Sequence, residues 1–198
     1  MNDTEQAPPP TLEEIEKATK KLGFEMASAR RTGALLRTLA ASKPGGRLLE
    51  LGTGTGLSSA WILDGMDATA SLDSLDNDGD AQAVATKYLS HDRRLTLHLS
   101  DGDEFIKSLT AGARRFDFIF ADTWPGKLRL LDETLDLLNS GAFYVVDDML
   151  PQPYWETLDF GYDHTAAIKD LVTTLENHAS LQVTKLAWDT GLLVAVKK

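Results

Sequence analysis

The chain has 198 residues, which suits one full α/β domain and is too short for two comfortable ones. Its formal net charge is -10, and an acidic surface argues against a general affinity for nucleic acids, whose phosphates require Lys and Arg. The absence of cysteine excludes disulfides and thiolate zinc sites and fits a cytoplasmic protein. No apolar run approaches the roughly 20 residues that a membrane helix requires.

Helices are expected before the first strand. Residues 1–10 end in three prolines and predict a disordered or extended leader ahead of a single domain over residues 11–198. The run Thr11-Leu12-Glu13-Glu14 has the form of a capping box, so a helix should begin there. A second helix should follow Ser28, which assigns residues 11–43 to N-terminal helices.

From Arg47 onward, apolar runs alternate with helical patterns. Predicted strands cover residues 47–51, 69–75, 95–99, 116–121, 142–146, 181–188 and 192–196. Predicted helices cover residues 57–66, 79–89, 103–109, 127–138 and 166–177. Repeated βα units that end in a hairpin predict a doubly wound, mostly parallel sheet with one antiparallel strand. Ligands of such sheets bind beyond the carboxyl ends of the strands, where this chain repeatedly places an acid.

A glycine-rich turn follows the first strand. Residues 48–58 are Leu-Leu-Glu-Leu-Gly-Thr-Gly-Thr-Gly-Leu-Ser, with glycines at alternate positions before a helix. Such a turn brings backbone N–H groups close to a ligand, because no Cβ stands in the way. A phosphate-binding loop would need Gly-Lys-Ser/Thr, whereas Leu57 and Ser58 follow Gly56. A dinucleotide turn would need G-x-G-x-x-G, and the third glycine here comes one residue early.

Acidic residues favour S-adenosylmethionine (SAM) as the ligand. Glu50, ahead of the glycines, suits the cationic amino acid end of SAM. Asp76, about 20 residues after the turn, is placed to accept from the ribose hydroxyls, and Asp101 to accept from the adenine amino group. Each Asp alone is more often a turn former or a helix cap, so the specificity lies in the whole set at successive strand ends.

Four segments give the chain a resemblance to a known family. They are Leu-Glu-Leu-Gly-Thr-Gly-Thr-Gly-Leu-Ser-Ser, Leu-Asp-Ser-Leu-Asp-Asn-Asp, Phe-Asp-Phe-Ile-Phe-Ala-Asp-Thr-Trp and Gly-Ala-Phe-Tyr-Val-Val-Asp-Asp-Met-Leu. The chain resembles class I SAM-dependent methyltransferases, and among them the small O-methyltransferases of the catechol and caffeoyl-CoA type. The resemblance extends from about Gly23 to the C-terminus. It implies a Rossmann-like methyltransferase fold with seven strands in the order 3-2-1-4-5-7-6 and a C-terminal antiparallel hairpin.

The resemblance also implies cofactor contacts. Ser58 would hold the methionine carboxylate, Met26 and Ser28 would lie against the cofactor, and Gly102 would join Asp101 at the adenine. Core packing is the alternative for Met26. The predicted cofactor-binding set is Met26, Ser28, Glu50, Gly52, Thr53, Gly54, Ser58, Asp76, Asp101, Gly102 and Asp122.

Three further acids predict a cation site. Asp122, Asp147 and Asp148 follow two neighbouring strands, and their repulsion would be relieved by a cation or a shared proton. Oxygen ligands suit Mg²⁺ or another divalent ion. In the resembled family, Asp, Asp and Asn hold such an ion, which orients the acceptor hydroxyl toward the sulfonium methyl. The resemblance therefore implies a metal site at all three residues and catalytic roles for Asp122 and Asp147.

Two positions depart from the family's pattern. Asp148 stands where Asn is common, and Pro125 stands where the family has a lysine that is often assigned as the base. Lys127 is the nearest lysine and the third candidate catalytic residue; the alternative is a solvated residue in the first turn of a helix. His164 could be a base or a structural histidine near a helix start. Aromatic residues between Met149 and His164, with Trp124, form a candidate acceptor wall, for which loop packing or a dimer contact is the alternative.

The expected function is methyl transfer from SAM to the hydroxyl oxygen of a small acceptor, for which an aromatic compound is one candidate, assisted by a metal if the acids bind one. N-methyl or aminopropyl transfer is one alternative, and a non-catalytic SAM-binding interaction protein is another. A small-molecule acceptor is the expected partner, with no nucleic acid and no membrane. The family likeness also implies a homodimer through the N-terminal helices.

Overall fold

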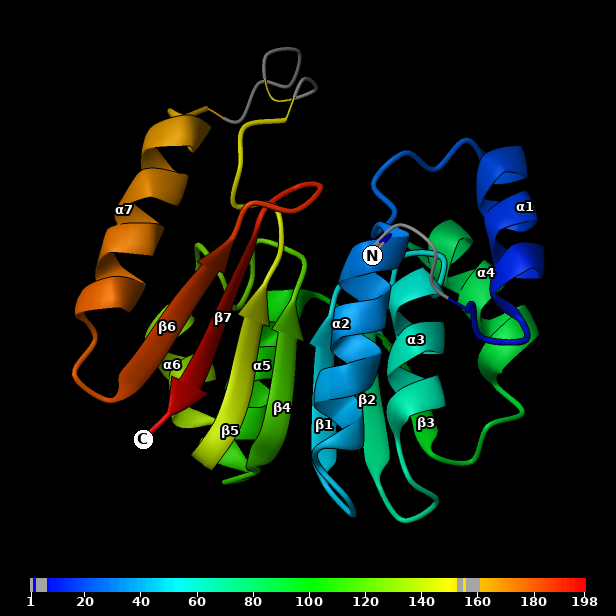
Figure 1. The fold of residues 1–198 in the computed structure, drawn as a ribbon, viewed down its shortest axis with the longest axis horizontal. Coiled ribbons are helices and arrows are strands. Elements are labelled where there is room, and N and C mark those ends of the chain that lie inside the picture. Colours follow the sequence, from blue (N-terminus) through cyan, green and yellow to red (C-terminus); the bar gives the residue numbers. More distant parts are fainter. Residues whose placement is uncertain (1, 3–6, 153–154, 156–160) are drawn as a thin grey trace.

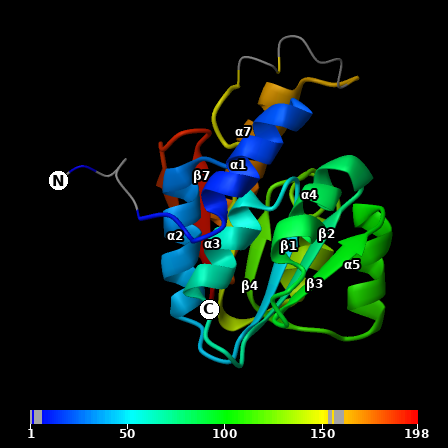
Figure 2. The same ribbon diagram turned by 90° about the vertical axis from the view of Figure 1, so that its right-hand side faces the viewer.

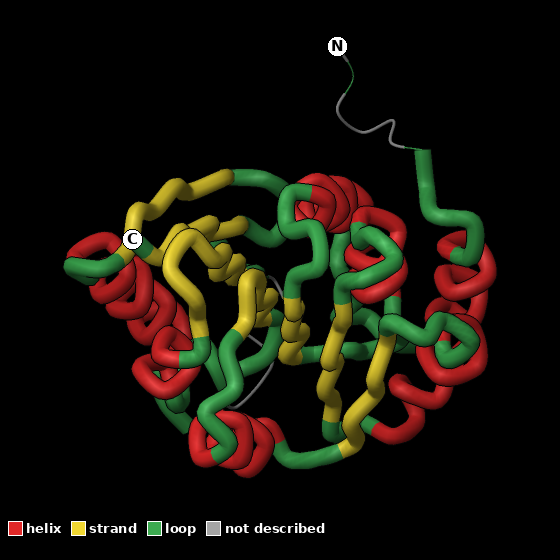
Figure 3. Tube along the Cα trace, turned by 90° about the horizontal axis from the view of Figure 1, so that it is seen from below, coloured by secondary structure: helices red, strands yellow, loops and turns green. Residues whose placement is uncertain are grey.

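A seven-stranded sheet with helices on both faces forms the body of the molecule (Figures 1 and 3). The computed structural model describes residues 2, 7–152, 155 and 161–198. The strands are β1 (Arg47–Leu51), β2 (Ser71–Asp76), β3 (Leu95–Leu99), β4 (Phe116–Ala121), β5 (Leu138–Val146), β6 (Leu181–Leu186) and β7 (Leu192–Lys197). The helices are α1 (Leu12–Leu22), α2 (Arg30–Ala41), α3 (Leu57–Gly65), α4 (Gly79–Leu89), α5 (Gly102–Ala111), α6 (Leu131–Asp136) and α7 (His164–Asn177). None of these described helices has the length and apolar composition needed to cross a membrane.

The strand order is β3-β2-β1-β4-β5-β7-β6, which confirms the predicted fold class and topology. β1 pairs in parallel with β2 and β4, whereas β7 pairs antiparallel with both β5 and β6. In Figure 1 the arrowheads of β4 and β5 point up and that of β7 points down. The parallel strands therefore bring their carboxyl ends, and the residues that follow them, to one edge of the sheet.

Residues along the central strands alternate between two hydrophobic cores. Leu48, Phe118 and Phe120 belong to a core that α1, α2, α3 and α4 cover. Leu49 and Ile119 belong to a second core, on the opposite face, that α5, α6 and α7 cover. Because both faces of β1 and β4 are buried, these strands are nearly continuous apolar runs, which is why their sequences predicted them well.

The predicted capping box at the start of α1 does not form. Thr11 makes no side-chain cap hydrogen bond, and the backbone N–H of Leu12 donates instead to the carbonyl of Pro9 at 3.1 Å. Pro9 is buried, and the carbonyl of Ala7 accepts from Arg37 of α2 at 2.9 Å. This end of the predicted leader therefore packs against the N-terminal helices. Residues 1 and 3–6 of the leader lie outside the described residues. Figure 2 shows α1 near the same end of the molecule as α4.

The predicted helix over residues 127–138 is wrong in its first part. α6 begins only at Leu131, because Gly126 and Leu130 have left-handed backbone conformations with φ of 85° and 54°. Before it, the carbonyl of Trp124 accepts the backbone N–H groups of three successive residues, from Lys127 to Arg129. The chain thus forms a compact turn beside the end of β4 rather than a helix. β5 in turn begins at residue 138, four residues before the predicted start.

Candidate functional site

A cleft of about 240 Å³ lies at the carboxyl ends of β1, β2, β4 and β5. Its walls come from the segment before α2, the glycine-rich turn, the end of β2, and the segments after β4 and β5. The predicted residues Met26, Ser28, Gly52, Thr53, Gly54, Ser58, Asp76, Asp122, Lys127 and Asp148 line it. Most of the sequence-predicted site therefore falls in one cavity.

The backbone of the glycine-rich turn forms one wall of the cleft. Gly52 has a φ of 106°, and a Cβ at this position would lie 2.7 Å from the backbone oxygen of Asp122. The N–H groups of Gly52 and Thr53 both donate to the carbonyl of Leu75 at 2.9 Å. The turn is thus held against the ends of β2 and β4, at a separation that only glycine permits.

Asp76, the last residue of β2, is fixed at the rim of this wall. Its Oδ2 accepts the N–H of Gly54 at 2.6 Å, and its Oδ1 accepts the N–H of Asp78 at 2.8 Å. Asn77 and Asp78 line the cleft beside it. A carboxylate that is oriented in this way by backbone donors can accept further hydrogen bonds from the hydroxyls of a ligand.

Glu50 lies beneath the turn rather than in the cleft. Its side chain is fully buried and accepts hydrogen bonds from Ser59 of α3 and, at 2.5 Å, from Ser74 of β2. Burial raises the pKa of Glu50 to about 7, against the opposing effect of these hydroxyls. Glu50 does not line the cleft, and its Oε1 has no hydrogen-bond partner among the described residues, so its contact with the cationic end of a ligand stays a prediction. The pleat of β1 turns Glu50 toward α3, where it supports the turn from below.

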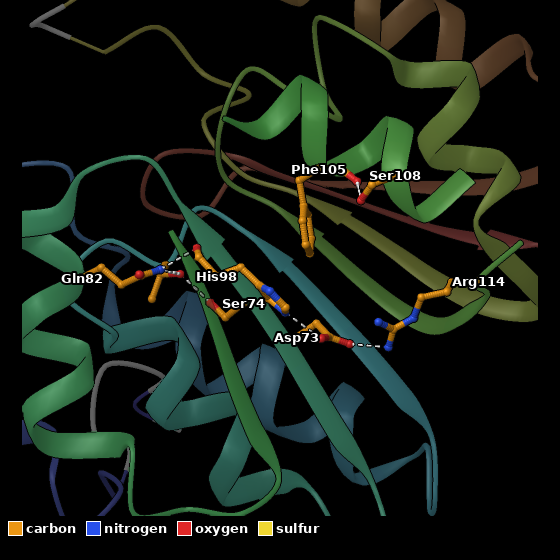
Figure 4. A network of polar contacts seen from close by, with 8 residues as sticks. Asp73, Ser74, Gln82, His98, Phe105, Ser108 and Arg114 are labelled. Atoms are coloured by element: carbon orange, nitrogen blue, oxygen red, sulfur yellow. Dashed lines mark hydrogen bonds and ion pairs between the residues drawn. The ribbon is translucent and has the colours of Figure 1, made fainter. Parts of the chain in front are cut away.

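From Ser74, which donates to Glu50, a polar network extends to the edge of the sheet. Figure 4 shows this network from Ser74 onward. Ser74 is hydrogen-bonded to Thr53 at 2.6 Å, and Gln82 of α4 donates to Thr53 at 3.3 Å and to the carbonyl of His98 at 2.9 Å. On the other face of β2, Asp73 pairs with His98 of β3 and with Arg114, each at 2.8 Å. The network joins β2, β3, α4 and the glycine-rich turn, so it fixes the turn, and Thr53 is the member that also lines the cleft.

The segment between α1 and α2 covers the turn. Met26 lines the cleft with 61% of its surface exposed, so the core-packing alternative for this residue is wrong. The Ser28 hydroxyl donates to Oδ2 of Asp122 at 3.0 Å. The ring of Phe24 lies 3.2 Å from where a Cβ of Gly54 would stand. Residues of the segment between α1 and α2 and of the end of β4 therefore meet over the turn.

Two predicted adenine contacts fall outside the cleft lining. The side chain of Asp101 caps α5 and accepts the N–H groups of Asp103 and Glu104 at 2.9 and 3.0 Å. Gly102 is buried, and a Cβ there would lie 2.6 Å from the ring of Pro125. Their adenine-binding roles stay predictions, whereas their observed contacts are those of a helix start.

The three acids after β4 and β5 are close neighbours but do not converge. Asp147 is 2% exposed, and its Oδ1 accepts the Thr190 hydroxyl and the N–H of Asp148. Among the described residues, no group of three His, Cys, Asp or Glu side chains is placed to hold a metal ion. The predicted ligand set of Asp122, Asp147 and Asp148 is therefore not assembled, because Asp147 turns toward the β6–β7 turn and Asp122 toward Ser28.

Burial and the proximity of these acids raise the pKa of two of them. Burial raises the pKa of Asp122 well above its usual range, and the charges of Asp147 and Asp148 raise it further. Burial also raises the pKa of Asp147 to about 6, although the Thr190 hydroxyl opposes this change. Lys127 lowers the pKa of both Asp122 and Asp147, so its charge reaches both carboxylates.

Lys127 is buried in the cleft wall. Only 3% of its surface is exposed, and its Nζ donates to the backbone carbonyl of Asp147 at 3.0 Å. The alternative of a solvated residue in a helix is therefore wrong. The reason is the turn before α6, in which the left-handed Gly126 directs the chain over the end of β1.

Aromatic rings gather around His164 at the start of α7. The ring centroids of Trp155 and Trp124 lie 4.5 and 6.5 Å from that of His164, both edge-on, and the Tyr162 hydroxyl lies 3.1 Å from its Nδ1. Burial and the charge of Lys127 lower the pKa of His164, which keeps its imidazole neutral near pH 7. Both tryptophans and His164 line the cleft. Other members of the predicted wall, Pro153, Tyr154, Glu156 and Phe160, lie outside the described residues.

Sequence reasoning missed several residues of the site. Asn77 directly follows the predicted Asp76, so the same strand-end rule could have found it. Phe24 and Thr190 carried no local signal, because they reach the site only through the packing of distant segments.

Comparisons with known proteins agree on one type of domain. Residues 49–149 match a family described as a methyltransferase domain. A candidate O-methyltransferase of Mycolicibacterium smegmatis is 26% identical over 170 residues, which cover 83% of this chain and 80% of that protein.

Solved structures share the fold over nearly the whole chain. A candidate O-methyltransferase from Klebsiella pneumoniae superposes with a TM-score of 0.83 at 22% identity, covering 97% of this chain and 91% of that one. The O-methyltransferase TomG from Streptomyces achromogenes, solved in complex with SAM, superposes with a TM-score of 0.82 at 20% identity, covering 98% and 91%.

Proposed function

The chain belongs to the methyltransferase-domain family, and on that premise we propose that it transfers the methyl group of SAM to a hydroxyl oxygen of a small acceptor. The observation that carries this proposal is a single cleft with a glycine-and-carboxylate wall at one end and buried ionisable groups at the other. The descriptions of its relatives, O-methyltransferases that include a SAM complex, support the choice of cofactor and of oxygen as the acceptor atom.

The residues present fit SAM. Gly52 lets the turn pack against the end of β4, where a Cβ would collide with the backbone of Asp122, and Asp76 presents a fixed carboxylate to the ribose hydroxyls. Ser58 lies at the first turn of α3, where backbone N–H groups and the helix dipole favour the carboxylate of the methionine moiety. When bound, SAM supplies an electrophilic methyl group and a neutral thioether leaving group.

The other end of the cleft would serve the acceptor. Trp124 and Trp155 offer apolar faces for a planar acceptor, and Lys127 offers a positive charge to its oxygen. His164 is able to take the hydroxyl proton, because its lowered pKa keeps the imidazole neutral. The raised pKa of Asp122 favours its protonated form, which can donate a hydrogen bond but cannot accept this proton.

Metal assistance is not part of this proposal. The three acids that were expected to hold a divalent ion do not converge, so the donor set does not fit such an ion. No step is therefore assigned to a metal.

Calorimetry and turnover test the proposal together. We expect SAM and S-adenosylhomocysteine to bind with heat, NADH to give none, and a panel of hydroxylated aromatic compounds to yield S-adenosylhomocysteine. Binding of NADH in place of SAM would overturn the assignment. Cofactor binding without turnover on oxygen, nitrogen or aminopropyl acceptors would instead favour a non-catalytic SAM-binding protein.

A further inference from the structure

The acceptor end of the cleft gathers three carboxyl groups and one ammonium group. Asp122 and Asp148 line the cleft, and Asp147 is buried and does not line it. Among the described residues that line the cleft, Lys127 is the one lysine, and arginine is not present. The balance of charge at this end therefore depends on the ammonium of Lys127.

The fold is built to keep this lysine inside. Gly126 packs so tightly that a Cβ there would lie 2.3 Å from Leu51, and its carbonyl accepts the hydroxyl of buried Tyr144. The N–H of Gly126 donates to the carbonyl of Arg129 at 2.7 Å, which closes the turn. A buried ammonium is costly unless it is paired and hydrogen-bonded. The Asp147 carbonyl accepts one hydrogen bond from the ammonium at 3.0 Å, and the carboxyl groups of Asp122 and Asp147 interact with its charge at longer range.

Two of the three carboxylates accept hydrogen bonds from neighbouring donors, through one oxygen each. Oδ2 of Asp122 accepts from Ser28, and Oδ1 of Asp147 accepts from Thr190 and from the backbone of Asp148. A divalent ion needs about six oxygen ligands that converge on one point. Among the described residues the three acids do not converge on one point, and an ion would also have to approach an ammonium of like charge, so the geometry favours the lysine over the ion.

We propose that the ammonium of Lys127 is the cation of this site, so that the enzyme is metal-independent and accepts compounds with a single hydroxyl group. This inference rests on the proposed methyl transfer. A divalent ion binds two adjacent oxygens of an acceptor, whereas an ammonium is a compact point charge that can hold one. The acceptor class is therefore a phenol or alcohol, for which a vicinal pair of hydroxyls is not required.

The transfer balances with these groups alone. The acceptor oxygen forms a bond to the methyl carbon while the carbon–sulfur bond breaks, and the electron pair of that bond stays on sulfur. The hydroxyl proton moves to His164 as negative charge on the oxygen is met by Lys127. The products are the methyl ether and S-adenosylhomocysteine, and one proton remains on the protein.

The first test is metal binding by the wild-type protein alone. After treatment with EDTA, titration with Mg²⁺, Mn²⁺ or Ca²⁺ should give no binding heat and no shift of the melting temperature. Turnover of a monohydroxylated phenol should change by less than about twofold between EDTA and added Mg²⁺. Saturable metal binding, or activity that EDTA removes and Mg²⁺ restores, would overturn the proposal, as would turnover restricted to vicinal diols.

The second test is the lysine itself. Lys127→Met should lower turnover about a hundredfold, as expected for loss of a group that stabilises an oxyanion, and should leave the affinity for S-adenosylhomocysteine within about twofold. Lys127→Arg, which keeps the charge, should recover part of the activity. Lys197→Met is the matched control, because the Lys197 Nζ also donates to a backbone carbonyl, that of Leu135 at 2.8 Å, but lies at the opposite end of the sheet.

The outcomes separate this inference from the proposed function. If wild-type protein does not bind SAM, the proposed function fails, whereas the metal titrations of wild-type protein stand by themselves. If Lys127→Met does not fold, Lys127→Arg and those titrations still decide the question. Full activity of folded Lys127→Met would contradict the inference while the methyl transfer is retained.

Discussion

The two ends of the cleft are built by different means. The cofactor end is made from backbone, with the glycine-rich turn bonded to the neighbouring ends of β2 and β4. The acceptor end is made from side chains that meet across the chain. Ser28 and Asp122 are 94 residues apart, Thr190 and Asp147 are 43 apart, and Lys127 and Asp147 are 20 apart.

This difference implies different tolerance to change. At the cofactor end, added volume should be harmful, because the backbone approaches to a distance that excludes a Cβ. At the acceptor end, changes of charge and hydrogen bonding should be harmful, because neighbouring acids lie close to one buried lysine. The predictions below follow from this contrast.

The largest expected effect is that of added volume at Gly52. Gly52→Ala should weaken binding of S-adenosylhomocysteine at least about a hundredfold and lower the free energy of unfolding by about 1–3 kcal/mol, through strain and collision with Asp122. Gly141→Ala is the control. Gly141 has a φ of 78° with no atom within 4 Å of its Cβ position, so this variant carries the strain alone. Calorimetry and thermal melting measure both effects. If Gly52→Ala and Gly141→Ala lost the same affinity and the same stability, the proposed difference between the two ends of the cleft would be contradicted.

The next effect is a pH dependence of stability that comes from Glu50. Its pKa is about 7 in the folded protein and lower when unfolded, so its neutral form favours folding. The contribution of neutral Glu50 to the free energy of unfolding is fully present below the pKa that Glu50 has in the unfolded chain. It is lost as the pH rises through 7. The loss, relative to Glu50→Gln, should be on the order of 3 kcal/mol. Chemical denaturation of both proteins between pH 4 and 8 measures it, and parallel stability curves would refute the assignment.

The smallest effect is the loss of one hydroxyl at the acceptor end. Thr190→Val removes a donor to buried Asp147 and should cost about 1–2 kcal/mol of stability. Turnover should fall while the affinity for S-adenosylhomocysteine stays unchanged. Thr173→Val, which removes an exposed hydroxyl on α7, is the control. If Thr190→Val lost affinity for S-adenosylhomocysteine to the same extent as it lost turnover, the cofactor end and the acceptor end would not act independently.

The same contrast explains what the sequence could predict. The strands and the glycine-rich turn were predicted because their signals are local: apolar runs in β1 and β4, and glycines at alternate positions after Glu50. The helix before residue 131 was wrong because Leu130 adopts a left-handed conformation that no local pattern indicates. The direction of Glu50 depends on the pleat of β1 and on the serines opposite it, which are set by packing.

At the acceptor end, the sequence could show which acids follow β4 and β5 but not where their side chains point. The metal prediction for Asp122, Asp147 and Asp148 assumed convergence, whereas Ser28 and Thr190 turn two of the three toward themselves. The burial of Lys127 results from a turn that the helical pattern concealed. Long-range hydrogen bonds of this kind lie beyond any reading of neighbouring residues.

A crystal structure of the protein with S-adenosylhomocysteine and Mg²⁺ tests the account most directly. We predict that the ligand lies along Gly52 with its ribose at Asp76, and that the Lys127 ammonium stands among the acids with no metal density between Asp122, Asp147 and Asp148. Metal density between these three residues, or a ligand placed away from the glycine-rich turn, would contradict it.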